Sequence, residues 1–211
     1  MGTLVSYSDV LTSEHCLEGE SLPHTAIIAG SIDFRLGIKY HFLWWITYAS
    51  WCTEMKKQLE FDSNDIAMIR LLSTMPNNII PVPITQEPNS HFYAEQATII
   101  TWSSQCSSVS PTIMDLAKVW VLKQKDCDKQ YSVLFKTKMK MHPRFLCTRA
   151  KPYILLECGD SGSPLLYRDT LIAVNVGLCP PIGDVPSGKK INIHIGIEYY
   201  KNFIYSLISK P

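Results

Sequence analysis

Short runs of β-branched and aromatic residues recur along the whole chain, and this pattern constrains the fold more than any other feature of the sequence. Turn-forming residues such as Pro, Gly, Asn and Ser separate many of the runs. Many short strands of this kind predict an all-β barrel or sandwich. The runs span residues 3–12, 24–32, 39–48, 66–72, 96–102, 117–123, 164–177 and 190–197.

Two segments follow a helical pattern instead. Residues 199–210 place Phe203, Ile204, Leu207 and Ile208 on one apolar face, which predicts a helix at the end of the chain. A second, short helix is predicted over 125–135, with Asp126 near its start.

Composition narrows the class of protein. The 211 residues suit one domain, or two small halves that share a core, and the 46% of hydrophobic residues predict a packed interior. The net charge is +1 and the basic residues are scattered, so we expect no nucleic-acid partner. We read the densest basic run, 136–144, as a solvated loop or strand edge. No apolar run reaches the roughly 18 residues that a membrane span needs, so we expect no membrane partner.

The seven cysteines are widely and irregularly spaced. None forms a CxxC pair and none clusters with histidine at zinc spacing, so we expect no metal and no cofactor. Such spacing favours disulfides and hence a secreted protein. The first residues do not form a signal peptide and the cysteine count is odd, so we expect part of the secreted protein to precede Met1.

The stretch LLECGDSGSPLLY (155–167) places Ser161 behind an aspartate and between glycines. This composition suits an ordinary turn, but it also suits a nucleophile whose neighbouring backbone N–H groups face a developing negative charge. A nucleophilic serine needs a base and a group that orients the base. His15 ends an apolar strand before a cysteine, and Asp65 opens another apolar strand. The other histidines stand in strand-like runs or loops, and these settings indicate no catalytic role for them: His24, His41, His91, His142 and His194.

Three blocks occur in the order TSEHC (12–16), DIAMIRL (65–71) and GDSGSP (159–164). They resemble the TAAHC, DIAL and GDSGGP blocks of the chymotrypsin-like serine peptidases, the trypsin/chymotrypsin family. The start of the chain resembles that family's GGSLIS…WVLTAAHC strand pair, and the likeness extends to the terminal helix with an insect-like character. The resemblance implies one peptidase domain of two six-stranded antiparallel β-barrels, the first incomplete. Residues 1–95 would form the rest of the first barrel, 96–197 the second, and 198–211 a C-terminal helix.

The resemblance also implies roles for individual residues. Ser161 would attack the scissile carbonyl, His15 would accept and return the proton, and Asp65 would orient the imidazole. The N–H groups of Gly159 and Ser161 would form the oxyanion hole. Asp160 would pair with the amino group freed when a zymogen is cut. The implied protein is a secreted monomer that acts on proteins or peptides and is a target for protease inhibitors.

The family pattern also pairs cysteines. It implies disulfides Cys127–Cys147 and Cys158–Cys179. The usual partner of Cys16 would lie before Met1, which leaves Cys16 unpaired here. Cys52 and Cys106 remain, and their pairing stays open.

Departures from the family pattern leave two matters open. Leu155 or Leu156 stands at the expected floor of the specificity pocket, which favours cleavage after apolar residues; the alternative is that both are core residues and the pocket is collapsed. The other expected pocket residues are Asn175, Val176, Gly177 and Asn192. Glu14 replaces a small apolar residue, and the loop before Ser161 is one residue short. These departures favour the alternative of a catalytically silent homologue that binds a partner through the same cleft.

Overall fold

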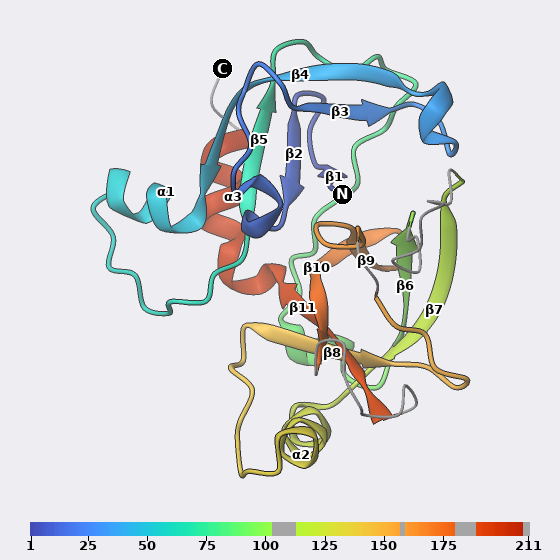
Figure 1. Cartoon of the computed structure of the whole chain (residues 1–211). Coiled ribbons are helices and arrows are strands. Elements are labelled where there is room, and N and C mark those ends of the chain that lie inside the picture. The colour runs from blue at the N-terminus through green and yellow to red at the C-terminus, as the bar shows by residue number, and fades with distance from the viewer. Residues whose placement is uncertain (103–112, 157–158, 180–188, 209–211) are drawn as a thin grey trace.

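The computed structural model describes residues 1–102, 113–156, 159–179 and 189–208 (Figure 1). Two β-structures, one from each half of the chain, lie against each other, with a helix from the end of the chain packed beside the first. The all-β prediction with a C-terminal helix is therefore confirmed.

The first half forms an antiparallel five-stranded sheet in the order β1–β2–β5–β4–β3. Its strands are β1 (Thr3–Leu4), β2 (Asp9–Thr12), β3 (Ala26–Ala29), β4 (Ile38–Thr47) and β5 (Ala67–Leu71). This sheet is not closed, in agreement with the expected incomplete first barrel. The run predicted over 3–12 is a hairpin rather than one strand, because Ser6 and Asp9 bond to each other across a tight turn.

The second half is a closed six-stranded barrel in the order β10–β11–β8–β7–β6–β9. Its strands are β6 (Gln96–Thr101), β7 (Asp115–Val121), β8 (Phe145–Arg149), β9 (Pro164–Tyr167), β10 (Thr170–Cys179) and β11 (Ile191–Gly196). The run predicted over 164–177 is two strands, since Arg168 and Asp169 both have positive φ and turn the chain back. The sequence pattern missed β8.

Three α-helices complete the described structure: α1 (Tyr48–Glu54), α2 (Gln124–Phe135) and α3 (Lys201–Ile208). The predictions of α2 and α3 are confirmed, whereas α1 was missed because it continues directly from β4. A disulfide between Cys127 and Cys147, with Cα atoms 5.9 Å apart, joins α2 to β8. No described helix is long and apolar enough to cross a membrane.

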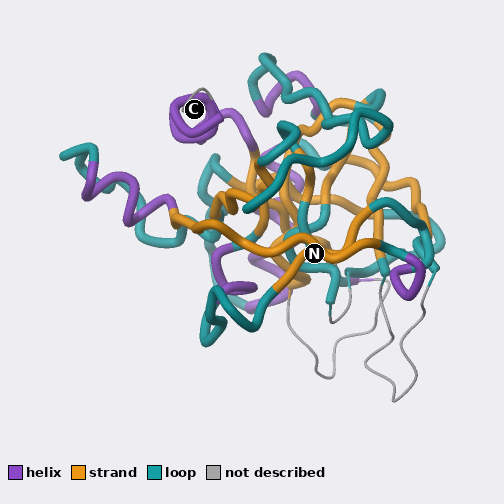
Figure 2. Tube along the Cα trace, turned by 90° about the horizontal axis from the view of Figure 1, so that it is seen from above, coloured by secondary structure: helices purple, strands orange, loops and turns teal. Residues whose placement is uncertain are grey.

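The α3 helix lies at the periphery of the molecule (Figure 2) and contributes buried side chains to its core. Phe203, Ile204 and Leu207 are buried and pack in one cluster with residues from both halves, among them Leu11 and Leu171. The Trp51 indole of α1 donates to Ser206 of α3 at 3.0 Å. This shared cluster joins the two halves, and the candidate site lies where they meet.

Candidate active site

The His15 and Asp65 side chains lie together because β2 and β5 are paired. Thr12 is opposite Ala67 in this ladder, so the short 3₁₀ helix η1 (Glu14–Leu17) after β2 lies beside the residue that opens β5. The Asp65 carboxylate makes two contacts with the histidine. Its Oδ2 lies 2.6 Å from His15 Nδ1, and its Oδ1 accepts the His15 backbone N–H at 2.9 Å. This two-point contact fixes the imidazole from its Nδ1 side.

The charge on Asp65 favours the protonated form of the histidine. The hydrogen bond from Asp65 raises the pKa of His15 above its usual 6.5, and a contact with the Cys16 thiol acts in the same direction. Burial acts to raise the pKa of Cys16, but the contacts with His15 and Thr12 and the charge of the N-terminal ammonium together lower it. Cys16 is a free thiol, as the sequence predicted. A base at this position would work best above neutral pH, where the imidazole has lost its proton.

The segment before Asp65 is held by the second half of the molecule. Asn64 is buried, and its Oδ1 accepts hydrogen bonds from the Tyr200 hydroxyl at 2.8 Å and from Arg144 at 3.4 Å. Its side-chain amide donates to the carbonyl of Phe61. The position of Asp65 therefore depends on its own strand and also on residues that lie 80 and 136 positions from Asn64 in the sequence.

Ser161 stands on a turn that requires glycine. Gly159 and Gly162 have φ values of +95° and +82°, a region that other residues rarely adopt. A Cβ on Gly162 would also clash with the Met1 carbonyl and the Thr12 hydroxyl. Within the described part of the chain, the backbone N–H groups of Gly159 and Ser161 donate no hydrogen bond.

The histidine and serine segments meet at one backbone carbonyl. Ser13, two residues before His15, donates its hydroxyl to the carbonyl of Asn175 at 2.8 Å. The N–H of Gly162, directly after Ser161, donates to the same carbonyl at 2.8 Å. The structure thus joins His15 to Asp65 directly and brings the segments that carry His15 and Ser161 to the same carbonyl. The Ser161 hydroxyl itself donates to the Val176 carbonyl at 3.4 Å, and in the described residues it makes no hydrogen bond to His15.

A buried network of hydrogen bonds supports the Ser161 turn. His194 is fully buried; its Nδ1 lies 2.5 Å from Asn175 Oδ1 and its Nε2 lies 2.8 Å from Thr148 Oγ1. The Asn175 amide donates to Ser163 at 2.5 Å, and Ser163 donates to the Asp160 carbonyl at 2.7 Å. Burial lowers the pKa of His194 to about 3, so the imidazole is neutral and has one donor and one acceptor nitrogen. No sequence signal indicated this role, because His194 stands in an ordinary strand-like run.

The expected pocket residues divide into two groups. The side chains of Leu156, Asn175 and Asn192 are buried, whereas Leu155, Val176 and Gly177 are partly exposed. Both polar ends of the Asn192 amide are occupied: its oxygen accepts the Leu156 N–H at 2.8 Å, and its nitrogen donates to the Ile154 carbonyl at 2.9 Å. No acidic side chain is among these residues.

Other expectations about single residues have mixed outcomes. Glu14 is partly exposed, and burial together with the charge of Asp65 raises its pKa. Cys52 is a free, buried thiol, and Cys106 lies outside the described residues. The expected Cys158–Cys179 pair also lies outside them, because Cys158 and the Cys179 side chain are not described. Among the described residues, no group of three or more His, Cys, Asp or Glu side chains could hold a metal ion.

Comparison with known proteins gives consistent matches. The family model described as Trypsin matches residues 1–204. Neuropsin, a serine protease expressed in the limbic system of mouse brain, has a TM-score of 0.78 and 20% identity, over 99% of this chain and 88% of neuropsin. The scabies mite inactivated protease paralogue S-D1 has a TM-score of 0.78 and 18% identity, over 100% of this chain and 88% of that one. The paralogue S-I1 has a TM-score of 0.75 and 18% identity, over 100% and 87%. At these identities the solved structures establish the shared fold.

Proposed function

Because this chain belongs to the trypsin family, we propose that it is a serine endopeptidase in which Ser161, His15 and Asp65 perform acyl transfer. The observation that carries the proposal is the two-point contact between Asp65 and His15, beside a serine on a glycine-dependent turn. The free N–H groups of Gly159 and Ser161 support it, because donors of this kind stabilise the oxyanion of the transition state.

The proposed reaction has two stages. Ser161 Oγ bonds to the scissile carbonyl carbon while His15 Nε2 takes the hydroxyl proton. The C–N bond then breaks, and His15 gives that proton to the departing amine. Water repeats the sequence on the acyl-enzyme: its proton goes to His15, its oxygen bonds to the carbonyl carbon, and Ser161 recovers its proton as the acid leaves. Asp65 keeps the Nδ1 proton in place throughout.

The test uses a fluorophosphonate probe, which forms a bond only with an activated serine, together with hydrolysis of peptide amides. Ser161→Ala and His15→Ala should abolish both labelling and hydrolysis. Ser90→Ala, which removes an exposed serine far along the sequence from the site, should change neither. Labelling that persists in Ser161→Ala would contradict the assignment of the nucleophile.

For specificity, we propose cleavage after apolar residues. Leu155 and Leu156 lie in the irregular segment that precedes the nucleophile turn, and the polar atoms of Asn192 are already paired. A floor formed by these leucines favours apolar side chains, since a cation there would have no partner. Peptides ending in Phe, Leu, Ala or Arg before the scissile bond distinguish these preferences, and a preference for Arg would contradict the proposal.

For location, we propose that the protein is secreted, made as a zymogen, and open to protease inhibitors at the same cleft. The Cys127–Cys147 disulfide supports secretion, because disulfides persist in oxidising compartments. An antibody against this chain should detect it in secreted fluid of the source tissue. Its presence only in the cytosol would contradict the proposal.

A second candidate function is a catalytically silent homologue that binds a partner through the cleft. Two observations favour it: the Ser161 hydroxyl is directed at the Val176 carbonyl, and two of the similar structures carry the description of inactivated protease paralogues. A folded protein that neither reacts with the fluorophosphonate probe nor cleaves any of the four peptides would favour this function over the peptidase.

A further inference from the structure

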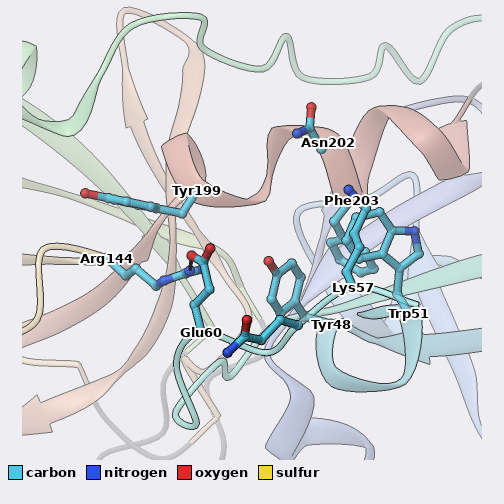
Figure 3. Close-up of a pocket in the computed structure, with 9 residues that line it drawn as sticks. Tyr48, Trp51, Lys57, Glu60, Arg144, Tyr199, Asn202 and Phe203 are labelled. Carbon is cyan, nitrogen blue, oxygen red and sulfur yellow. Dashed lines mark hydrogen bonds and ion pairs between the residues drawn. The ribbon is translucent and has the colours of Figure 1, made fainter. Parts of the chain in front are cut away.

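A pocket of about 380 Å³ lies apart from the Ser161 turn, between α1, the segment 57–60 and α3 (Figure 3). Its lining combines cationic and aromatic side chains. In Figure 3, Arg144 and Glu60 approach each other on one side of the pocket, Lys57 and Trp51 lie on the other, and Tyr48 lies between them. The volume is within the range typical of small-ligand sites, which run from about 300 to 1,000 Å³.

Arg144 is the most unusual residue in this pocket. Its side chain is buried at 4% exposure, and its guanidinium lies 5.1 Å from the ring centre of Tyr199 and 5.4 Å from that of Tyr200. Tyr48 and Phe61 complete the surrounding aromatic rings, at 5.9 and 5.8 Å. Guanidinium groups stack well on aromatic faces, so these rings hold the cation in place without neutralising it.

Arg144 donates to Asn64 at 3.4 Å and to Glu60 at 3.3 Å, and it also contacts the hydroxyl groups of Tyr48 and Tyr200. Its Nε has no hydrogen-bond partner in the described structure. A guanidinium has five N–H donors and pairs best with a carboxylate in a two-bond fork. The site therefore holds a buried cation with unused capacity to bind an anion.

Glu60 is the only carboxylate paired with Arg144 among the described residues, and it is poorly placed to neutralise it. Its side chain is 77% exposed, and exposed ion pairs contribute little. Lys57 adds a second positive charge, with its Nζ 5.2 Å from the centre of the Trp51 ring. The carboxylate of nearby Glu198 is engaged elsewhere, since it accepts the backbone N–H of Asn89 at 2.8 Å. The pocket thus contains two cationic side chains, those of Arg144 and Lys57, and one exposed carboxylate, that of Glu60.

We propose that this pocket is an exosite for an acidic peptide segment that carries a carboxylate next to an aromatic side chain. The ligand carboxylate replaces Glu60 on Arg144 and forms the two-bond contact that the Glu60 side chain does not make. A second acidic group of the peptide pairs with Lys57. The aromatic side chain packs on Tyr48 and on Tyr199, which is 39% exposed. The peptide belongs to a substrate or regulatory partner bound outside the cleft that holds Ser161.

The test is fluorescence anisotropy with the labelled peptide amide Gly-Glu-Phe-Glu-Gly and the complete chain carrying Ser161→Ala, so that cleavage plays no part. The same peptide with Gln in place of both Glu residues should bind at least about tenfold more weakly, because it lacks the charge-assisted bonds. Equal binding of both peptides would overturn the proposal. Inorganic phosphate serves as a competitor. If it displaces the peptide, the anion subsite is common to phosphates and carboxylates; if it does not, the subsite recognises the carboxylate fork.

Variants at exposed positions distinguish binding of the peptide in this pocket from non-specific attraction of the acidic peptide to surface cations. Glu60→Gln should tighten binding by about two- to fivefold, since it removes the competing carboxylate, and Lys57→Ala should weaken binding by a similar factor. Lys39→Ala, which removes an exposed cation in β4, is the matched control and should have no effect. Weaker or unchanged binding in Glu60→Gln, or an effect of Lys39→Ala equal to that of Lys57→Ala, would overturn the proposal. Because the readout is binding to an inactive variant, either result leaves the peptidase proposal untouched.

Discussion

Acid should destabilise this protein through His194, the fully buried imidazole beneath the Ser161 turn. The hydrogen bonds of the ring suit a neutral imidazole, which has one donor and one acceptor nitrogen. Nδ1 donates to Asn175 Oδ1, because the amide nitrogen of Asn175 already donates to Ser163. Nε2 accepts from the Thr148 hydroxyl. A second ring proton would have to displace the Thr148 hydrogen and would place an unpaired charge in the interior. Folding therefore requires the unprotonated ring.

The magnitude follows from the pKa of His194 in the two states. Burial lowers it from 6.5 to about 3. As the pH falls below about 6.5, the imidazole becomes protonated in the unfolded state but stays unprotonated in the folded state. The free energy of unfolding therefore falls by up to about 1.4 kcal/mol per pH unit. Between pH 7 and pH 5 the expected loss from this residue is about 2 kcal/mol, and it continues toward pH 3. This is a large part of the stability of a typical domain.

The measurement is urea denaturation at pH 7, 6, 5 and 4.5, followed by far-ultraviolet circular dichroism. His194→Asn retains a donor for Asn175 but does not titrate. It should lower stability at pH 7 by about 1–3 kcal/mol, because Thr148 loses its acceptor. Its stability should then fall less steeply with pH than that of the parent protein.

His24→Asn provides the matched control, because His24 is exposed. It should keep the parent's pH dependence. If His194→Asn loses stability between pH 7 and pH 5 as steeply as the parent, the buried imidazole is not the source of the acid sensitivity and the reasoning is wrong.

Three further predictions concern the candidate site. Asp65→Asn should lower the pKa of His15 and so shift the acidic limb of the pH–rate profile to lower pH, while kcat falls by about 10⁴-fold; an unshifted limb would contradict the role given to Asp65. Gly162→Ala should lower the melting temperature and abolish labelling by the fluorophosphonate probe, because the left-handed turn and Thr12 Oγ1 leave no room for a Cβ; a stable, labelled variant would refute this. Glu14→Gln should raise the free energy of unfolding at pH 7 by less than about 1 kcal/mol. The pKa of this partly solvated carboxyl is raised in the folded state, so its ionised form opposes folding above about pH 4.5. Calorimetry at pH 7 and pH 4 should show the gain only at pH 7.

Local patterns in the sequence determined much of the fold. Runs of β-branched and aromatic residues placed nearly all the strands, and the apolar stripe at Phe203, Ile204 and Leu207 placed α3, because side-chain periodicity is a local property. The sequence missed β8 and α1 for the same reason. β8 is a short segment after a basic run, and α1 follows β4 without a turn signal.

The candidate triad could also be recognised from sequence, since each member stands in a motif of its own. The motifs do not predict the contacts between the three residues. The distance from His15 to Asp65 follows from the pairing of β2 with β5, and the approach of the histidine and serine segments follows from two bonds to one carbonyl of Asn175.

Only the tertiary structure decided which polar residues are buried and what they contact. His194 and Arg144 are ordinary residues of a strand-like run and a basic run in the sequence, yet one is a neutral imidazole in the core and the other a cation surrounded by aromatic rings. Their partners are far away along the chain: Glu60 lies 84 positions from Arg144, and Asn175 lies 19 from His194. Burial and pairing set the charge state and the ligand preference of such groups, and both depend on contacts that form only when distant segments pack together.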